Sequence, residues 1–370
     1  MKLFEYMGKE LFSAYGIAIP RGKMVENPAD AAKAAEDIGG TVVIKSQILS
    51  GKRGKGGGIK FATGAGEAHA AAEAILSTTV QGYNVERLLV EEKIQIDKEL
   101  YLAITVDGSA KKPVIIASSR GGVDIEEVAD EHIVKQHVDI TIGVYPYLGK
   151  EIARRMGLGG RPAVEFARLL TRLYRCFKDK DAELVEINPL VISGDTLIAA
   201  DSKVTIDDDA LFRQKDVPYV EERTSIEKQA HDLGLAFVEL GGNIAVMANG
   251  AGMSMGSLDT LVHYGGSPAN FLDAGGGTGV EGTAKALELL LQTNPKVIFI
   301  NIFGGITRCD DVANALIQVK QAGDIPVPVV IRLVGTNEEE GVRILKENGI
   351  EAYKVMQEAA AKAVEIANAG

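Results

Sequence analysis

A glycine- and base-rich loop at residues 50–58 carries the clearest chemistry in this sequence. It reads Ser-Gly-Lys-Arg-Gly-Lys-Gly-Gly-Gly and lies between two short apolar runs. Glycines let backbone N–H groups approach an anion, and nearby cations hold it. Although the chain has a net charge of −11, this loop carries three cations, Lys52, Arg53 and Lys55. The pattern predicts a polyphosphate site. A solvated hairpin tip is the alternative, but Lys45 at the end of the preceding run favours the phosphate site.

The loop is not a P-loop, because Lys55 is followed by Gly rather than Ser or Thr. The runs on both sides of it read as strands, whereas a P-loop joins a strand to a helix. We therefore expect a strand–loop–strand hairpin that folds over phosphates.

A second group of polar residues has the composition of a magnesium site. Asn188 lies within the run Glu186-Ile187-Asn188-Pro189-Leu190, and Asp201 follows the next predicted strand. The two strands form a predicted hairpin that turns at 193–195, so both oxygens can face one cation. Mg²⁺ takes few protein oxygens and completes its shell with phosphates and water. The alternative is that Asn-Pro only begins a turn; the basic loop favours the metal site.

Three further motifs carry weaker signals. The apolar strand that ends at Glu91, followed by Glu99, is a candidate edge for a base and a ribose. Residues 247–256 pass from a strand into a helix through Asn249 and a Gly-Ala-Gly run, and the start of that helix is a candidate anion site. Residues 277–282 match the dinucleotide fingerprint, but no acidic residue ends the next strand, so we interpret the match as chance.

The chain supplies no covalent catalyst of its own. Its five histidines have no nucleophile or metal-ligand spacing, and no nucleophile elbow is present. Its two cysteines lie too far apart for a zinc site or a disulfide framework. An acidic chain without a basic, aromatic stripe is a poor nucleic-acid binder. The absence of a signal peptide and of a long apolar run predicts a cytoplasmic protein with no membrane segment.

The arrangement of elements predicts two α/β domains. Helices and strands alternate up to about residue 206, with one long helix expected over 151–177. The charged stretch 207–227 is the best linker. After it, short apolar strands at 244–248, 270–273, 297–301 and 327–333 are each followed by a glycine-rich or polar turn. This rhythm is typical of a doubly wound parallel sheet with ligands at the carboxyl ends of its strands.

Taken together and in order, these motifs closely resemble the β subunit of succinyl-CoA synthetase over essentially the whole chain. The motifs that carry the resemblance are 45–47 with the basic loop, 121–126, 186–190, 249–252, 268–273 and 301–310. The resemblance implies an ATP-grasp region over residues 1–225, with a lid-like subdomain at about 20–95. A flavodoxin-like CoA-ligase domain that contacts an α subunit would follow over 226–370.

The resemblance also assigns roles to individual positions. The expected phosphate contacts are Lys45, Lys52, Arg53 and Gly54. The expected base and ribose positions are Glu91, Ile94 and Glu99. Asn188 and Asp201 would bind Mg²⁺, and Glu186 would steady a histidine of the α subunit. The expected substrate-site positions, shared with that subunit, are Asn249, Gly305, Ile306 and Thr307.

The implied reaction is succinate, CoA and ATP (or GTP) to succinyl-CoA, ADP (or GDP) and phosphate, through a phosphohistidine on the α subunit, which also carries the CoA site. Three residues depart from the family's usual pattern: Lys52, Ser202 and Thr307. A hydroxyl at Thr307 would suit a hydroxylated acid, so malate is an alternative substrate. Two rival functions stay open, a self-sufficient ATP-grasp ligase and a nucleotide-sensing subunit without turnover.

Overall fold

The computed structural model describes residues 1–50, 56–80, 82–277, 279–323 and 325–369. The chain divides into two compact units, an N-terminal unit (Met1–Glu222) and a C-terminal unit (Arg223–Gly370). Each unit has apolar cores of its own.

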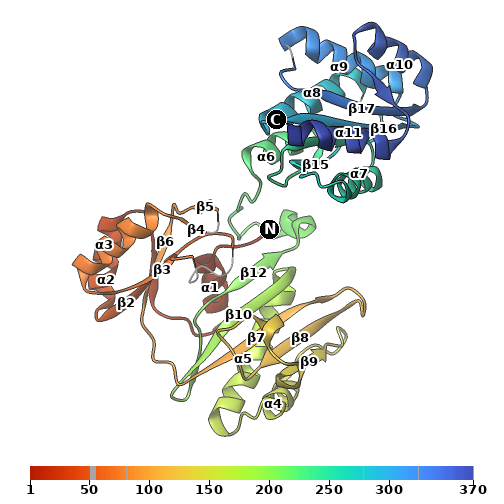
Figure 1. Cartoon of the computed structure of the whole chain (residues 1–370). Helices are drawn as coiled ribbons and strands as arrows, with labels where there is room; N and C mark the ends of the chain where they lie inside the picture. Colours follow the sequence, from red (N-terminus) through yellow and green to blue (C-terminus); the bar gives the residue numbers. More distant parts are fainter. Residues whose placement is uncertain (51–55, 81, 278, 324, 370) are drawn as a thin grey trace. The chain divides into compact units, whose positions relative to one another are not determined.

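A four-stranded antiparallel sheet with the order β1-β6-β2-β3 forms the first part of the N-terminal unit. Its strands are β1 (Gly22–Val25), β2 (Thr41–Ser46), β3 (Ile59–Thr63) and β6 (Leu88–Glu92). Two alanine-rich helices, α2 (Pro28–Ile38) and α3 (Ala65–Leu76), cover one face of it (Figure 1). Small buried side chains on both helices let them lie close to the sheet. A short hairpin, β4 (Thr79–Val80) and β5 (Tyr83–Asn84), follows α3.

A larger sheet completes the N-terminal unit, with the order β11-β10-β7-β8-β9 and β12 also paired to β10. Its strands are β7 (Lys98–Asp107), β8 (Lys112–Ser118), β9 (Ile133–His137), β10 (Ala182–Ser193), β11 (Thr196–Ala199) and β12 (Lys203–Ile206). The helices of this part are α1 (Glu5–Ala14), α4 (Pro146–Arg155) and α5 (Gly160–Asp179). Short 3₁₀ turns lie at Ile125–Glu127, Asp130–His132 and Asp208–Arg213. The sheet and its helices share one apolar core, in which α5 buries Phe166, Leu170 and Leu173.

Two expectations about this unit are corrected. The single helix predicted over 151–177 is wrong, because α4 ends at Arg155 and α5 begins at Gly160. Gly157 lies between the two helices and has a φ of 73°, and Gly160 is the first residue of α5 and has a φ of 59°. Such backbone does not continue a helix, and the apolar spacing on both sides hid the break. The predicted linker 207–227 is also partly ordered, since it contains the turn Asp208–Arg213 and the start of α6 (Ser225–Asp232).

The C-terminal unit is a doubly wound sheet with the order β13-β15-β14-β16-β17-β18. Its strands are β13 (Ala236–Glu239), β14 (Ile244–Ala248), β15 (Asn270–Asp273), β16 (Val297–Gly304), β17 (Val329–Gly335) and β18 (Ala352–Tyr353). All the pairings are parallel except that of the edge strand β13. In chain order, the five parallel strands run 2-1-3-4-5, which is the flavodoxin-like order.

Helices cover both faces of this sheet (Figure 1). Successive side chains of a strand point to opposite faces of the sheet, so alternate residues of these strands lie in two separate cores. Ala245 and Met247 of β14 lie in one core with α8 (Gly279–Gln292) and α9 (Cys309–Gly323). Ile244 and Val246 lie in the other core with α7 (Ala251–His263) and α11 (Met356–Ala369). The remaining helix, α10 (Glu338–Glu347), lies beside α9. Among the described residues, no helix is both long and apolar enough to cross a bilayer.

Candidate functional site

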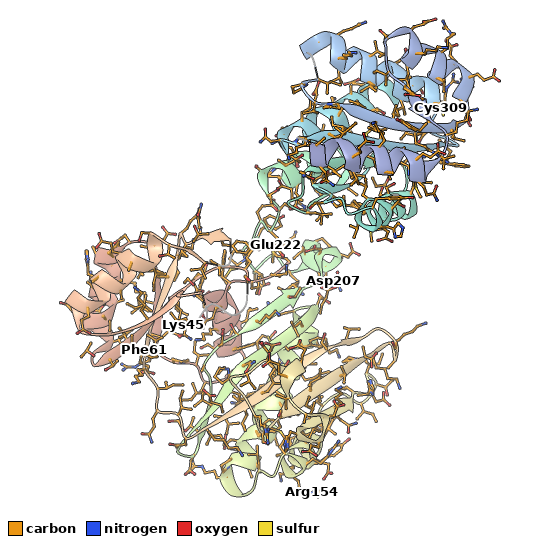
Figure 2. The ribbon with its side chains drawn as sticks, in the orientation of Figure 1. Lys45, Phe61, Arg154, Asp207, Glu222 and Cys309 are labelled. Atoms are coloured by element: carbon orange, nitrogen blue, oxygen red, sulfur yellow. The ribbon has the colours of Figure 1, made fainter. Side chains whose placement is uncertain are left out.

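Lys45, at the end of β2, joins a buried group of charges. Its Nζ donates to Glu5 Oε1 at 2.8 Å and to the Ala200 carbonyl at 2.7 Å, and lies 2.8 Å from Glu91 Oε2. Figure 2 labels Lys45 beside α1, the helix that carries Glu5. The Lys45 side chain is 12 % exposed, and the side chains of Glu5 and Glu91 are almost fully buried. The ammonium group expected to meet phosphates is therefore held by protein oxygens in this structure.

The charge of Lys45 is maintained by its neighbours. Burial favours the neutral amine, but the carboxylates of Glu5, Glu91 and Asp201 and the hydrogen bond to Glu5 act more strongly together. The net result is a pKa of Lys45 raised above its ordinary value. Lys45 is consequently a fixed cation across the neutral pH range, as a phosphate ligand must be.

Two hydrogen bonds hold helix α1 in place beside the buried charges of Lys45, Glu5 and Glu91. The Ser202 hydroxyl donates to the Glu5 carbonyl at 2.7 Å, and the Gln47 amide oxygen accepts from the Tyr6 N–H at 3.0 Å. Gly8 permits the close approach, because a Cβ there would meet Ser202 Oγ at 2.5 Å. The departure noted at Ser202 thus has a structural role.

We expect Ser202→Ala to lower the free energy of unfolding of the N-terminal unit by about 1–3 kcal/mol, because it leaves the Glu5 carbonyl without this donor in a buried position. Urea unfolding of the chain measures this. Ser77→Ala is the matched control, since its hydroxyl also donates to a helix carbonyl (Ala74, 3.1 Å) but at an exposed position. Equal losses in the two variants would contradict the assigned role.

The strand register sets Asn188 opposite Asp201. On one side of this pair Leu190 faces Ala199, and on the other side Glu186 faces Lys203. Both pairs follow one antiparallel register, so the positions between them, 188 and 201, also face each other. The register of β10 against β7 shifts between Ile187 and Leu190, which places Asn188 at an irregularity of the strand.

The Asn188 amide is fixed by the neighbouring loop. Its Oδ1 accepts from the Gly122 N–H at 2.8 Å, and its Nδ2 donates to the Val123 carbonyl at 3.0 Å. Asp201 Oδ1 accepts from the Ser202 N–H at 2.7 Å. Asn188 contributes an amide oxygen and Asp201 contributes a carboxylate, both of which are hard acceptor groups. The pair therefore offers hard oxygen ligands from two rigid positions.

The donor set fits Mg²⁺ held largely by a bound phosphate. In the described part of the chain, no cluster of three or more His, Cys, Asp or Glu side chains could hold a metal ion. Mg²⁺ does not need such a cluster, because it is commonly bound by one or two protein oxygens plus phosphates and water. Asn188 and Asp201 match that requirement.

Glu186 occupies the next position along the same face as Asn188. Its Oε2 accepts from the Tyr101 hydroxyl at 3.1 Å. The pKa of Glu186 lies above its ordinary value, mainly because the carboxyl group is buried. Lys203 and the Tyr101 hydrogen bond act in the opposite direction and lower this pKa. The negative charges of Asp201 and Glu126 raise it. Because Asp201 acts on both Lys45 and Glu186, the three side chains form one continuous electrostatic group.

The other predicted nucleotide positions differ in what the structure describes of them. Glu99 is in β7, and the loop at Gly121–Gly122 lies against it, since a Cβ on Gly122 would overlap its carboxylate. Ile94 lies half-buried in the connection between β6 and β7. Glu91, by contrast, directs its carboxylate into the buried ion pairs. Residues 51–55 of the basic loop, with the predicted contacts Lys52, Arg53 and Gly54, lie outside the described residues.

In the C-terminal unit, Asn249 marks the switch point of the sheet. It follows β14, and its side chain bonds the backbone of Phe303 in β16 twice, at 2.8 Å and 2.9 Å. The next residue, Gly250, is the N-cap of α7 and has a φ of 88°. Its N–H donates to Asp273 Oδ1 at 2.6 Å. The connections that follow strands 1 and 3 of the 2-1-3-4-5 order leave on opposite faces of the sheet, since α7 and α9 pack in different cores. Open α/β sheets bind ligands at such a point.

The segment Gly305–Thr307 follows β16 at the same edge. Ile306 is 83 % exposed, whereas Thr307 is 7 % exposed. The Thr307 hydroxyl accepts from the Gly277 N–H at 3.5 Å and donates to the Gly275 carbonyl at 3.4 Å. Thr307 therefore ties two loops together in this structure, and Ile306 is the side chain that faces outward.

The comparisons with known proteins agree with this geometry. The model of the ATP-grasp domain matches residues 2–192, and the CoA-ligase model matches residues 247–366. The succinate–CoA ligase [ADP-forming] subunit β of Methanothermobacter thermautotrophicus is 46% identical, with 99% of both chains covered. That of Aquifex aeolicus is 44% identical, covering 100% of this chain and 99% of its own. This chain belongs to the succinate–CoA ligase β-subunit family.

The predicted order of an ATP-grasp region followed by a flavodoxin-like CoA-ligase domain is confirmed for this family member. A solved structure of ATP citrate lyase from Methanothrix soehngenii, in complex with citrate and coenzyme A, shares the fold. Its TM-score is 0.73 at 21% identity, with 98% of this chain and 99% of that chain covered.

Sequence reasoning missed several residues that contact the predicted site positions. Glu5 and Lys9 are both buried and pair with Lys45 or Glu91, and Tyr101 bonds Glu186. One signal for the first two was present, because residues 5, 9 and 12 share a helix face and Phe12 is fully buried. No signal marked Tyr101, whose role depends on the register between β7 and β10.

Proposed function

We propose that this chain is the nucleotide-binding subunit of an acid–CoA ligase that converts succinate, CoA and ATP to succinyl-CoA, ADP and phosphate. One observation carries the proposal. Lys45, Asp201, Asn188 and Glu186 come from three separate stretches of sequence and meet in one group within an ATP-grasp unit. The relatives named as ADP-forming support ATP over GTP.

Asn188 and Asp201 are the residues that would hold Mg²⁺. When bound, the ion supplies charge neutralisation on the nucleotide's phosphate oxygens. Lys45 would add a fixed cation for the same phosphates, and Lys52, Arg53 and Gly54 are proposed as further phosphate contacts. The proposed positions on the base and ribose side are Glu91, Ile94 and Glu99. Glu91 would act through its neighbours, because its carboxylate is engaged in ion pairs with Lys9 and Lys45.

The phosphoryl acceptor is proposed to be a histidine of a partner α subunit. Glu186 would accept a hydrogen bond from that imidazole and hold it in line with the γ-phosphate. The phosphohistidine would then pass its phosphoryl group to a succinate carboxylate. Attack by the CoA thiol on the resulting acyl phosphate releases inorganic phosphate and forms the thioester.

The carboxyl edge of the C-terminal sheet is the proposed partner-facing substrate site. The N-terminus of α7 directs free N–H groups outward there, which suits an anion such as a phosphohistidine. Asn249 and the segment Gly305–Thr307 would line the site. Because the Thr307 hydroxyl already bonds two backbone groups, succinate is favoured over malate as the acid.

Lys45→Met is expected to reduce kcat/KM for the nucleotide by about a hundredfold to a thousandfold, the usual effect of removing one charge-stabilising donor. The ligation rate of the chain assembled with its α subunit measures this. Lys60→Met, an exposed position on the neighbouring strand β3, is the control and should stay near wild type. Unchanged nucleotide kinetics in Lys45→Met would rule out this lysine as a phosphate ligand.

Two rival functions have distinct signatures. A self-sufficient ATP-grasp ligase would join a carboxylate to an amine without a partner, so activity of the purified chain alone would favour it. A dehydrogenase rests only on the fingerprint at 277–282, and failure to bind NAD removes it.

A further inference from the structure

Two lysines in the N-terminal unit share one set of oxygen atoms. Lys9 Nζ lies 2.8 Å from Glu5 Oε1 and donates to Glu91 Oε1 at 2.5 Å and to the Ala200 carbonyl at 2.8 Å. Lys45 Nζ contacts the same three residues at 2.7–2.8 Å. The two ammonium groups are therefore interchangeable partners of the same acceptors.

The two lysines differ in what else they can reach. The Lys9 side chain is 3 % exposed and projects from the buried face of α1. The Lys45 side chain is 12 % exposed. Lys45 is the next-to-last residue of β2 and pairs with Ile59, the first residue of β3. Only Lys45 is placed to turn toward a ligand.

The carboxylates of Glu5 and Glu91 are matched one for one by ammonium groups only when both lysines are present. Lys9 and Lys45 offset Glu5 and Glu91, and Asp201 lies close enough to act on Lys45. If Lys45 moved to a phosphate without Lys9 in place, the nearly fully buried carboxylates of Glu5 and Glu91 would both lose their lysine partners. Buried, uncompensated carboxylates are strongly unfavourable, so Lys45 would be retained by them.

We propose that Lys9 is a resident counter-ion that frees Lys45 for the nucleotide. Lys9 keeps Glu5, Glu91 and the Ala200 carbonyl satisfied while Lys45 exchanges its protein acceptors for phosphate oxygens. Lys9 is thus a positioning residue that acts through Lys45 and does not touch the substrate. The proposal rests on the proposed function, in which Lys45 binds the phosphates.

Charge balance predicts that two single variants change the nucleotide affinity in opposite directions and that combining them restores it. Lys9→Met leaves one cation for two carboxylates, so affinity for a non-hydrolysable ATP analogue with Mg²⁺ should fall about tenfold or more. Glu5→Gln removes one carboxylate and should tighten binding. The double variant Lys9→Met/Glu5→Gln restores the balance and should bind within a few-fold of wild type. Isothermal titration calorimetry on the assembled αβ enzyme measures all three.

A purely structural role predicts a different pattern, because both changes would then weaken binding and the double variant would be worst. In the kinetics, Lys9→Met should raise the KM for ATP more than it lowers kcat. The matched control is Lys285→Met/Glu281→Gln, which removes another Glu–Lys pair of the same helical spacing and 2.8 Å length at an exposed position. This control should bind the analogue as the wild type does.

The outcomes separate the inference from the proposed function. If Lys45→Met binds the analogue normally, the phosphate role of Lys45 fails. If Lys45→Met loses binding but Lys9→Met keeps wild-type affinity, the counter-ion role alone is overturned. Should Lys9→Met not fold, Glu5→Gln and the double variant decide, and a tenfold loss of affinity in either one overturns the proposal.

Discussion

Asp201→Asn is expected to reduce nucleotide-dependent succinyl-CoA formation by about a hundredfold to a thousandfold, while the chain still folds and assembles with its partner. The change keeps the size of the side chain but removes the negative charge that faces Asn188. Because hard anionic oxygens favour Mg²⁺, the apparent affinity for the ion should fall as well, and excess Mg²⁺ should restore part of the rate. Steady-state rates measured over a Mg²⁺ series test both effects.

Asp195→Asn is the control for Asp201, since Asp195 lies at the exposed turn of the same hairpin and pairs with Arg161 at 2.9 Å on the surface. It should leave the rate near wild type. A wild-type rate in Asp201→Asn would contradict the metal assignment and would favour a nucleotide-sensing subunit that does not take part in turnover.

Glu186→Gln is expected to lower the ligation rate by about a hundredfold or more, because an amide does not stabilise a histidine that gains positive character. Nucleotide affinity should change little. The same variant should be more thermostable than wild type at neutral pH. Burial raises the pKa of Glu186 in the folded chain, so the stability that this carboxyl contributes is present below its unfolded pKa and is lost as the pH rises through the folded value.

Replacing Glu186 by Gln removes that loss, so the gain in Tm should be larger at pH 8 than at pH 5, in EDTA-containing buffer. Glu183→Gln, an exposed position on the same strand, is the control for both rate and Tm. A lower rate accompanied by a lower Tm at pH 8 would indicate that Glu186 supports the fold rather than the reaction.

The sequence predicted the local geometry best where polar residues fall in strands with a clear apolar periodicity. The hairpin that turns at 193–195 followed from alternating apolar residues, and the register that this hairpin imposes sets Asn188 opposite Asp201. The parallel sheet of the C-terminal unit followed from short apolar strands that end in glycine-rich turns. The roles of the two domains, and the position of the boundary between them at 225/226, stay predictions.

What the sequence missed depends on contacts between distant segments. Glu5 and Lys9 look like an ordinary surface pair on an amphipathic helix, and only the docking of α1 against Lys45 and Ala200 buries them. The sequence marked Ser202 only as a departure from the family's usual pattern, whereas the structure shows its hydroxyl donating to the Glu5 carbonyl of that helix. The break between α4 and α5 was missed because the apolar spacing continues across the glycines.

The most direct test of the phosphoryl relay follows the γ-phosphate. The chain is assembled with its α subunit, given Mg²⁺ and γ-labelled ATP without succinate or CoA, and the subunits are separated under denaturing conditions. We predict acid-labile, base-stable label on the α subunit, and its loss when succinate and CoA are added. Label on this chain, or no label on either subunit while ligation proceeds, would contradict the relay.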